Sequence, residues 1–533
     1  MKLVRPIYFI ILCAVFIIIF TNTVFFHNVL QVFPLSRENI FFLISVVLVY
    51  YILLVIVFSL FSFKKTLKPF LTLMLFISAT VHYFMDSYQI VVDKPMIENV
   101  MQTTSSEIFD LLSIKFFITL FVLALLPSYI MYKIPLEYVG FKREFIRRVR
   151  FILLHLLVLI VLLFTFSKFY TTFFREHKEL RLYTNPLATL YNGVDYILEK
   201  VLTQTMPMKI IGEDAHISKN REKERNIVIM VVGEAARADH FSLNGYVKNT
   251  NPFLAKEDVV NFSQMYACGT TTAISVPCMF SMYNSDEYNS VKGWHTHSVL
   301  DVLSRAGVDV LWRENNSDSK GVATRVPFEY YKTNFHNRVC DDECRDEGML
   351  IGLDAVIEKS KKDIIIVLHQ MGNHGPAYYK RYPKEFKKFT PVCETNQLES
   401  CTTEEIHNAY DNALRYTDYF LAKTIQLLKR YEESANTTMI YMADHGESLG
   451  ENGFYLHGLP NIIAPQSQTH VGALMWFGKH NPVDKDRLKM KAKNHYSHDY
   501  LFSTLLGLFS VETKVYDPNL DILTQHMTDY GDL

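Results

Sequence analysis

The sequence predicts an N-terminal α-helical transmembrane bundle followed by an α/β domain. The first 170 residues hold long apolar stretches at 6–26, 40–62, 69–85, 114–131 and 151–170. Each is about as long as the ~17–25 residues that cross a bilayer. From residue 226 short apolar runs alternate with helical patterns, which is typical of a mostly parallel sheet covered by helices. We therefore expect a transmembrane domain at 1–170, a linker at 171–225 and an α/β domain at 226–533.

The length and charge of the chain support two domains and exclude one class of partner. At 533 residues the chain is too long for one ordinary core. Its formal net charge of -1 argues against a nucleic-acid partner, since nucleic-acid binders carry a basic patch or stripe. The first apolar stretch is too long for a signal-peptide core and lacks a small-residue cleavage site, so we expect it to be retained.

Basic residues predict how the spans are oriented. They precede the first span, separate the second from the third, and separate the fourth from the fifth, whereas the loop 86–113 is mainly acidic. The positive-inside rule then places the N-terminus in the cytoplasm and, after five crossings, everything beyond about residue 171 on the outer side of the membrane. The basic residues concerned are Lys2, Arg5, Lys64, Lys65, Lys68, Lys142, Arg143, Arg147, Arg148 and Arg150.

The cysteines agree with an exported C-terminal part. Cys13 lies in the first span, where it is a small apolar side chain. The others form sequence-local pairs in the exported part, which in an oxidising compartment predicts disulfides. A zinc knuckle is the alternative, although the pairs lack CxxC spacing and neighbouring histidines. The paired cysteines are Cys268 with Cys278, Cys340 with Cys344, and Cys393 with Cys401.

Residues 171–225 are interpreted as a helical connector. Leucine, phenylalanine and tyrosine alternate there with arginine and lysine. This mixture suits helices that lie on the membrane surface with tyrosine at the level of the headgroups. A helical linker packed on the soluble domain is the alternative, and the composition does not separate the two.

In the C-terminal part we predict strands at 226–232, 308–312, 364–368 and 438–442, with helices at 296–306, 348–360, 404–430 and 498–508. Polar clusters follow several of these strands directly. The carboxyl ends of parallel strands form the edge where open α/β sheets bind ligands. We therefore expect the polar clusters to lie close together.

Glu234 follows the first of these strands, and Asp444 and His445 follow the last. Two carboxylates and an imidazole can hold one divalent metal, and mixed nitrogen and oxygen ligands suit zinc better than magnesium. A single Asp-His pair is more often a turn or a cap, so the hypothesis depends on the clusters that accompany it.

A segment crowded with hydroxyl groups, 268–278, lies between two cysteines. If these are bridged, the segment is a ring that holds a hydroxyl at a helix start, where free N–H groups favour an anion such as phosphate. Metal coordination is one way to activate a threonine hydroxyl. The alternative is a threonine-rich helix cap without chemistry. Further polar clusters are 315–320, 369–376, and Glu447 with His457.

Four motifs, together with the tail Ser497-His498-Asp499 and the five spans, closely resemble the bacterial phosphoethanolamine transferases. The best-known members of that family modify lipid A and confer resistance to polymyxins. The resemblance implies an alkaline-phosphatase-like (sulfatase-like) α/β domain that is anchored to the inner membrane and faces the periplasm. The four motifs are 233–240 (GEAARADH), 268–281 (CGTTTAISVPCMFS), 373–376 (NHGP) and 443–451 (ADHGESLGE).

The resemblance also implies roles for individual residues. Thr272 corresponds to the nucleophile, and its oxygen joins Glu234, Asp444 and His445 around zinc. Contacts to the headgroup and its phosphate correspond to Ser317, Lys320, His374 and His457. Contacts to the lipid donor correspond to Asn99, Thr103 and Glu107, whose spacing of four places them on one helical face.

The implied reaction is ping-pong. Thr272, activated by zinc, attacks the phosphorus of phosphatidylethanolamine and releases diacylglycerol. An acceptor on lipid A or the lipooligosaccharide core then takes phosphoethanolamine from Thr272. Lys320 and His374 stabilise the phosphoryl oxygens, and His374 or His457 acts as general acid or base. We expect a membrane-bound monomer.

Three alternatives are weighed against this interpretation. A sulfatase on the same fold would need an arginine where Met279 stands. A phosphoglycerol transferase would share the metal site, so only its donor distinguishes it. A non-catalytic membrane sensor would have lost metal ligands, whereas Glu234, Asp444 and His445 remain. Many relatives also carry a cysteine pair around Lys320 where this chain has Ser319 and Ala323, so we expect a more mobile loop.

Overall fold

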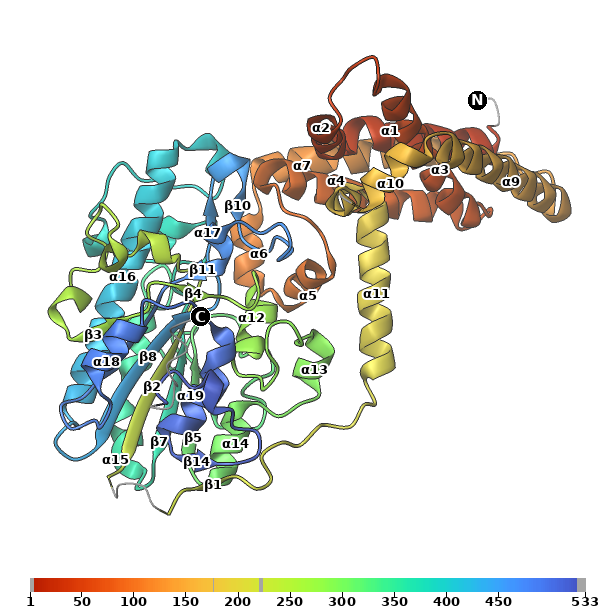
Figure 1. Ribbon diagram of the computed structural model, residues 1–533. Helices are drawn as coiled ribbons and strands as arrows, with labels where there is room; N and C mark the ends of the chain where they lie inside the picture. The colour runs from red at the N-terminus through yellow and green to blue at the C-terminus, as the bar shows by residue number, and fades with distance from the viewer. Residues whose placement is uncertain (1–3, 176, 220–223, 525–533) are drawn as a thin grey trace. The chain divides into compact units, whose positions relative to one another are not determined.

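The computed structural model describes residues 4–175, 177–219 and 224–524 (Figure 1). Contacts divide the chain into two compact units. The membrane unit comprises Met1–Ile97 and Leu112–Ile197, and the α/β unit comprises Glu98–Leu111 and Leu198–Leu533. This division differs from the boundaries expected at 170 and 226. Much of the expected linker packs with the spans, and the segment Glu98–Leu111 belongs with the α/β unit.

The membrane unit contains most of the expected spans. Four helices in the described part of the chain are long and apolar enough to cross a membrane, or up to five if the bent pair α1–α2 is one span. These two helices meet at 66°. At the bend, the Asn22 amide donates to Asn185 O at 2.7 Å and Asn185 N donates back to Asn22 Oδ1 at 3.0 Å. The helices are α1 (Pro6–Thr21), α2 (Thr23–Val32), α3 (Ile40–Leu60), α4 (Leu67–Tyr88), α7 with η1 and α8 (Ile114–Lys133) and α9 (Phe141–Thr165).

The fifth expected span, 151–170, is displaced. Helix α9 begins at Phe141, includes the basic residues up to Arg150, and ends at Thr165. Lysine and arginine are good helix formers, so the basic stretch extends the helix instead of ending it.

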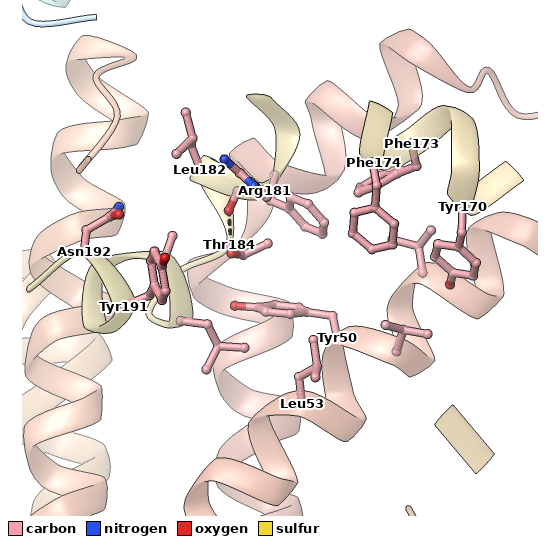
Figure 2. A pocket seen from close by; sticks show the side chains of 15 residues that line it. Tyr50, Leu53, Tyr170, Phe173, Phe174, Arg181, Leu182, Thr184, Tyr191 and Asn192 are labelled. Carbon is pink, nitrogen blue, oxygen red and sulfur yellow. Dashed lines mark hydrogen bonds between the residues drawn. The ribbon is translucent and has the colours of Figure 1, made fainter. Parts of the chain in front are cut away.

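The first part of the expected linker is helical and packs against the spans. It forms α10 (Ser167–Arg175), η2 (Lys178–Tyr183) and α11 (Leu187–Thr203). The Tyr170 ring lies 5.2 Å from that of Phe42, and its hydroxyl is 3.0 Å from Ser45 Oγ. Figure 2 shows the cavity of about 510 Å³ between these elements and α3, lined mainly by apolar and aromatic side chains with Arg181 at its edge.

The α/β unit is built on a seven-stranded sheet in the order β3-β12-β8-β2-β7-β5-β6. Strands β8, β2, β7, β5 and β6 are parallel to one another, and β12 is antiparallel to β8 and β3. All four predicted strands are confirmed, and the mostly parallel sheet agrees with the expected fold class. The strands are β2 (Asn226–Gly233), β3 (Val259–Asn261), β5 (Asp309–Glu314), β6 (Phe328–Tyr330), β7 (Ile364–His369), β8 (Asn436–Ala443) and β12 (Ala473–Phe477).

Helices cover both faces of this sheet, with α16 on one side and α14 and α19 on the other (Figure 1). Because both faces are covered, the central strands are continuous apolar runs. The expected helix 348–360 is in fact broken, since Gly352 adopts a left-handed φ of 74° between a 3₁₀ turn and α15. The helices are α12 (Thr272–Met279), α13 (Ser290–Trp294), α14 (Val299–Ala306), α15 (Leu353–Lys359), α16 (Thr403–Lys429), α17 (Gln466–Thr469), α18 (Lys485–Lys491) and α19 (Leu501–Leu508).

Smaller sheets and disulfides complete the α/β unit. Strand β4 (Met265–Tyr266) lies between β11 (His470–Val471) and β13 (Tyr496–Ser497). Two antiparallel pairs join β1 (His216–Ile217) to β14 (Val511–Glu512) and β9 (Ser448–Leu449) to β10 (Tyr455–Leu456). The predicted disulfides are confirmed, and the zinc-knuckle alternative is wrong. The bridges are Cys268–Cys278, Cys340–Cys344 and Cys393–Cys401, and Cys13 is free and buried.

Candidate functional site

Three of the predicted metal ligands meet at the carboxyl ends of two neighbouring strands. Glu234 follows β2, and Asp444 and His445 follow β8. The two strands are parallel with Gly233 opposite Ala443, so the residues that come next lie side by side. One ligand atom from each of the three side chains lies within 4.8 Å of the others, and all three side chains are fully buried.

The unpaired oxygen and nitrogen atoms of these three side chains favour binding of a cation. Glu234 Oε1 and Asp444 Oδ2 are buried without a hydrogen-bond partner. His445 Nδ1 donates to Gly446 O at 2.8 Å, so its Nε2 carries a lone pair, and that atom lies 3.4 Å from both carboxylate oxygens. Burial and, next, the charge of Asp444 raise the pKa of Glu234 well above its ordinary value. Electron-rich atoms held together out of water repel one another, and a divalent metal fits this donor set.

The Thr272 hydroxyl faces the same group. Its Oγ1 lies 3.2 Å from Glu234 Oε2 and 3.3 Å from His445 Nε2. Thr272 is the first residue of α12, and the ring that carries it is closed by the Cys268–Cys278 bridge, as expected from the sequence. A phosphate at this position would meet the free N–H groups of the first helical turn.

Asn316 forms a hydrogen bond that orients Glu234, and the sequence did not predict this contact. Its side-chain amide donates to Glu234 Oε2 at 2.7 Å and to Gln370 O at 2.9 Å, and its own N–H donates to Glu314 Oε1 at 2.7 Å. These bonds fix the Glu234 carboxylate from one side and leave Oε1 free to bind a metal. Ser317, to which the resemblance assigns a contact, is the next residue and is half-buried.

The two candidate histidines differ in their surroundings. His457 Nδ1 is 2.8 Å from Glu447 Oε2, and Tyr378 donates to the other oxygen of that carboxylate at 2.7 Å. Burial opposes the charged form of His457, but the charge and hydrogen bond of Glu447, together with the charges of Asp444 and Glu107, outweigh burial and raise the pKa of His457 above its ordinary value. Burial lowers the pKa of His374 to about 3. The site thus offers one imidazole with a raised pKa and one with a lowered pKa.

These histidines adjoin the metal group. The ring of His457 lies 4.1 Å from that of His445 and 5.9 Å from that of His374. Glu447 was named in the sequence analysis only as part of a polar cluster. Its partner His457 lies ten residues further along the chain, and that spacing is not a recognisable signal for a carboxylate that orients a histidine ring.

Lys320 lies on the loop that follows β5. It is buried, adopts a left-handed φ of 51°, and its Nζ lies 3.4 Å from Gln102 O. Burial lowers the pKa of its ammonium group. Ser319 Oγ accepts from Ala323 N at 3.2 Å, so a hydrogen bond closes this loop.

Asn99, Thr103 and Glu107, which the resemblance assigns to contacts with the lipid donor, do not share one helix. Helix α5 (Lys94–Gln102) ends before Thr103, and α6 (Ser105–Leu111) begins after it, so the expected single helical face is wrong. Glu107 accepts from Thr104 N at 3.3 Å and from Thr104 Oγ1 at 2.8 Å, which caps the second helix. Glu107 also forms a buried ion pair with Lys332 at 2.8 Å, and Thr103 Oγ1 donates to Asn99 O at 2.7 Å.

Comparisons with known proteins fit this geometry. The family model described as Sulfatase matches residues 226–511, and the model described as Phosphoethanolamine transferase EptA/EptB matches residues 50–201. The chain is 42% identical over 520 residues to Phosphatidylethanolamine transferase Mcr-1 of Escherichia coli, with 95% of each chain covered. It is 41% identical over 523 residues to Phosphoethanolamine transferase EptA of E. coli K12, with 96% of this chain and 95% of the relative covered.

A solved structure covers nearly the whole chain. The integral membrane protein lipooligosaccharide phosphoethanolamine transferase A from Neisseria meningitidis superposes with a TM-score of 0.94 at 34% identity. The match covers 98% of this chain and 99% of that one. Similarity therefore extends over both units and is not confined to the sheet.

Proposed function

Because this chain belongs to the phosphoethanolamine transferase family, we propose that it transfers phosphoethanolamine from phosphatidylethanolamine to a lipid A or lipooligosaccharide core acceptor. It works in the inner membrane with its α/β unit in the periplasm and as a monomer. The observation that carries the proposal is the position of Thr272 Oγ1, 3.2 Å from Glu234 and 3.3 Å from His445.

Zinc is the metal that this donor set suits best. Two carboxylates, one imidazole and one alkoxide are the hard and borderline ligands that zinc accepts in a four-coordinate site. Glu234, Asp444, His445 and Thr272 would hold it, and when bound it supplies the charge that makes the Thr272 hydroxyl acidic.

Different residues of the chain have different roles in the transfer reaction. The Thr272 hydroxyl releases its proton to solvent, Oγ1 forms a bond to the donor phosphorus, the bond from phosphorus to the glycerol oxygen breaks, and diacylglycerol leaves with a proton on that oxygen. His457, whose pKa is raised beside Glu447, is suited to supply that proton. Lys320 and His374 contact the phosphoryl oxygens. An acceptor hydroxyl next gives its proton to His457, its oxygen forms a bond to the phosphorus, and the bond from phosphorus to Thr272 Oγ1 breaks.

The alternative functions find less support. Met279, which stands where a sulfatase would need an arginine, is fully buried on α12 and offers no charge to a sulfate. A non-catalytic sensor would have no use for unpaired carboxylates held in a buried cluster. A phosphoglycerol transferase shares the cluster, and its donor distinguishes it.

The function is tested by mass spectrometry of lipid A and core from Gram-negative cells that express the chain or its Thr272→Ala variant. We expect one phosphoethanolamine added to lipid A or core with the wild type and none with the variant. A glycerol phosphate addition would favour the phosphoglycerol alternative. An identical lipid profile in both strains would contradict the proposal.

Asn316 provides a test of the metal site that does not remove a ligand. Asn316→Ala takes away the donor that orients the Glu234 carboxylate, and loss of such supporting bonds typically weakens metal affinity by about 10–100-fold. Zinc affinity is measured by competition with a chelator. Asn408→Ala is the matched control, because Asn408 is also buried and its amide donates to Pro391 O at 2.8 Å. Unchanged affinity in Asn316→Ala would refute this role.

A further inference from the structure

A strand from the C-terminal part of the α/β unit leads to the segment 268–278. The Cys268–Cys278 bridge closes this segment into a ring that carries Thr272, the nucleophile ring. Strand β13 pairs in parallel with β4, with Ser497 opposite Tyr266. Strand β4 leads two residues later into Cys268, where the ring begins. This pairing brings His498, the residue after β13, to the base of the ring, more than 200 residues away along the chain. The resemblance to relatives includes His498 but gives it no role.

The His498 imidazole forms hydrogen bonds both to the nucleophile ring and to the end of β8. Its Nδ1 lies 3.2 Å from Cys268 N and 3.2 Å from Ser275 Oγ, and its Nε2 lies 3.0 Å from Ala443 O. A backbone N–H can only donate and a carbonyl can only accept. The proton is therefore on Nε2, Nδ1 is the acceptor, and the ring is neutral. His498 is 1% exposed, and burial lowers its pKa to about 4, so this hydrogen-bond pattern holds at neutral pH.

The hydrogen-bond partners of this imidazole lie close in the chain to the proposed nucleophile and to a proposed metal ligand. Ala443 directly precedes the proposed metal ligand Asp444 at the end of β8. Cys268 opens the ring that carries Thr272, and Ser275 lies one turn after Thr272 on α12. The Ser275 hydroxyl also bonds to Asp444 O. The buried His498 imidazole thus connects the backbone at the start of the loop that follows β8 (the metal loop, 443–447) to the backbone of the nucleophile ring.

The disulfide cannot make this connection. Cys268 and Cys278 belong to the same segment, so their bridge closes the ring without attaching it to β8. Two other bonds attach the ring to the loop after β10: Thr270 Oγ1 donates to Leu459 O at 2.6 Å, and the Asn461 amide donates to Cys268 O at 3.0 Å. Two described contacts join the ring to the end of β8: the Ser275 hydroxyl donates directly to Asp444 O, and Cys268 N is connected to Ala443 O through His498.

We propose that His498 is a positioning residue that sets the distance between the Thr272 hydroxyl and the metal loop. The inference rests on the proposed function and deepens it, since His498 is neither a proposed metal ligand nor a proposed substrate contact and acts through its hydrogen bonds to Cys268 and Ala443. A displacement of about 1 Å at a reacting group can cost about 10²-fold in rate. An anchored ring keeps the hydroxyl at its place while substrate binds and leaves.

The test uses the purified full-length protein and two variants. Each variant removes one of the two His498 hydrogen bonds, to Cys268 N or to Ala443 O. His498→Asn keeps an acceptor for Cys268 N and loses the bond to Ala443 O. His498→Gln reaches Ala443 O and loses the acceptor at the ring. We expect either variant to form the Thr272 phosphoethanolamine adduct about 10²-fold more slowly, by a fall in kcat with KM for phosphatidylethanolamine changed less than about threefold. Zinc content should stay at the wild-type level, because Glu234, Asp444 and His445 are intact.

The control variant is His470→Asn. His470 belongs to the same small sheet, on β11, and the described hydrogen bond of its imidazole runs from Nε2 to Ser263 O at 2.8 Å, outside the segment 268–278. It should form the adduct at the wild-type rate. Wild-type rates in both His498 variants would overturn the proposal and leave the function standing. Loss of zinc and of the folded state in both variants would also overturn it, because His498 would then serve the fold. A wild-type protein without any Thr272 adduct would instead refute the proposed function.

Discussion

Thr272→Ala should reduce phosphoethanolamine transfer to background while the protein stays folded and inserted in the membrane. The substitution removes one buried hydroxyl whose described hydrogen-bond partners are both proposed metal ligands, Glu234 and His445. Without it no atom of the chain at this position can form the bond to phosphorus. Intact-mass analysis after incubation with phosphatidylethanolamine should show one phosphoethanolamine adduct on the wild-type protein and none on the variant.

Thr271→Ala is the matched control for that experiment. Thr271 is the neighbouring residue at the start of α12, it is equally buried, and its hydroxyl has no hydrogen-bond partner. The control should keep its adduct, which separates loss of the reacting hydroxyl from a general effect on the ring. An adduct that persists in Thr272→Ala would place the nucleophile on another residue.

Asp444→Ala should remove both the bound zinc and the Thr272 adduct, and His445→Ala should do the same. Each substitution deletes one arm of the buried donor group, and the remaining ligands cannot complete a tetrahedral site. The measurement is zinc per protein after dialysis, together with the adduct mass. An Asp444→Ala protein that retains its full metal would disprove this site.

His374→Ala and His457→Ala are the comparison variants for the metal measurement. They should keep the tightly bound zinc and slow turnover by about 10²–10⁴-fold, as expected for groups that move protons or hold phosphate. A second group, His445 with Glu447 and His457, could bind another ion at high metal concentration. The dialysis step removes such a weaker ion, so that only loss of the tight site is counted.

Local patterns were sufficient to predict the elements and the residue types of the site. The apolar run 227–232 predicts a strand, because a strand covered on both faces has no solvent side. Glu234, Asp444 and His445 follow such runs directly, so their approach to one another follows from a parallel sheet. A local signal was also overlooked. Thr104 and Glu107 have the spacing of a capping box, which starts a new helix where a continuous one was expected.

Other contacts had no signal in the chain. The Asn316 amide meets Glu234 because β2, β7 and β5 are neighbours, and the strand order of a sheet is not encoded in any single strand. The segment Glu98–Leu111 groups with the α/β unit through ion pairs that join Glu107 to Lys332 and Asp110 to Arg381, partners more than 200 residues apart. Such pairs depend on geometry that charge patterns along a chain do not contain.

The sequence by itself determined that this protein is a membrane-anchored α/β enzyme with an acidic and imidazole group beside a hydroxyl-bearing ring. Hydrophobic periodicity, charge asymmetry and strand-end residues are properties of short stretches, so they can be read without a structure. The tertiary structure alone decided which carboxylate oxygens remain unpaired, that His445 directs its Nε2 lone pair at them, and that His498 connects the two loops. These features arise where atoms from distant segments are buried together, and there each donor must find an acceptor within about 3 Å.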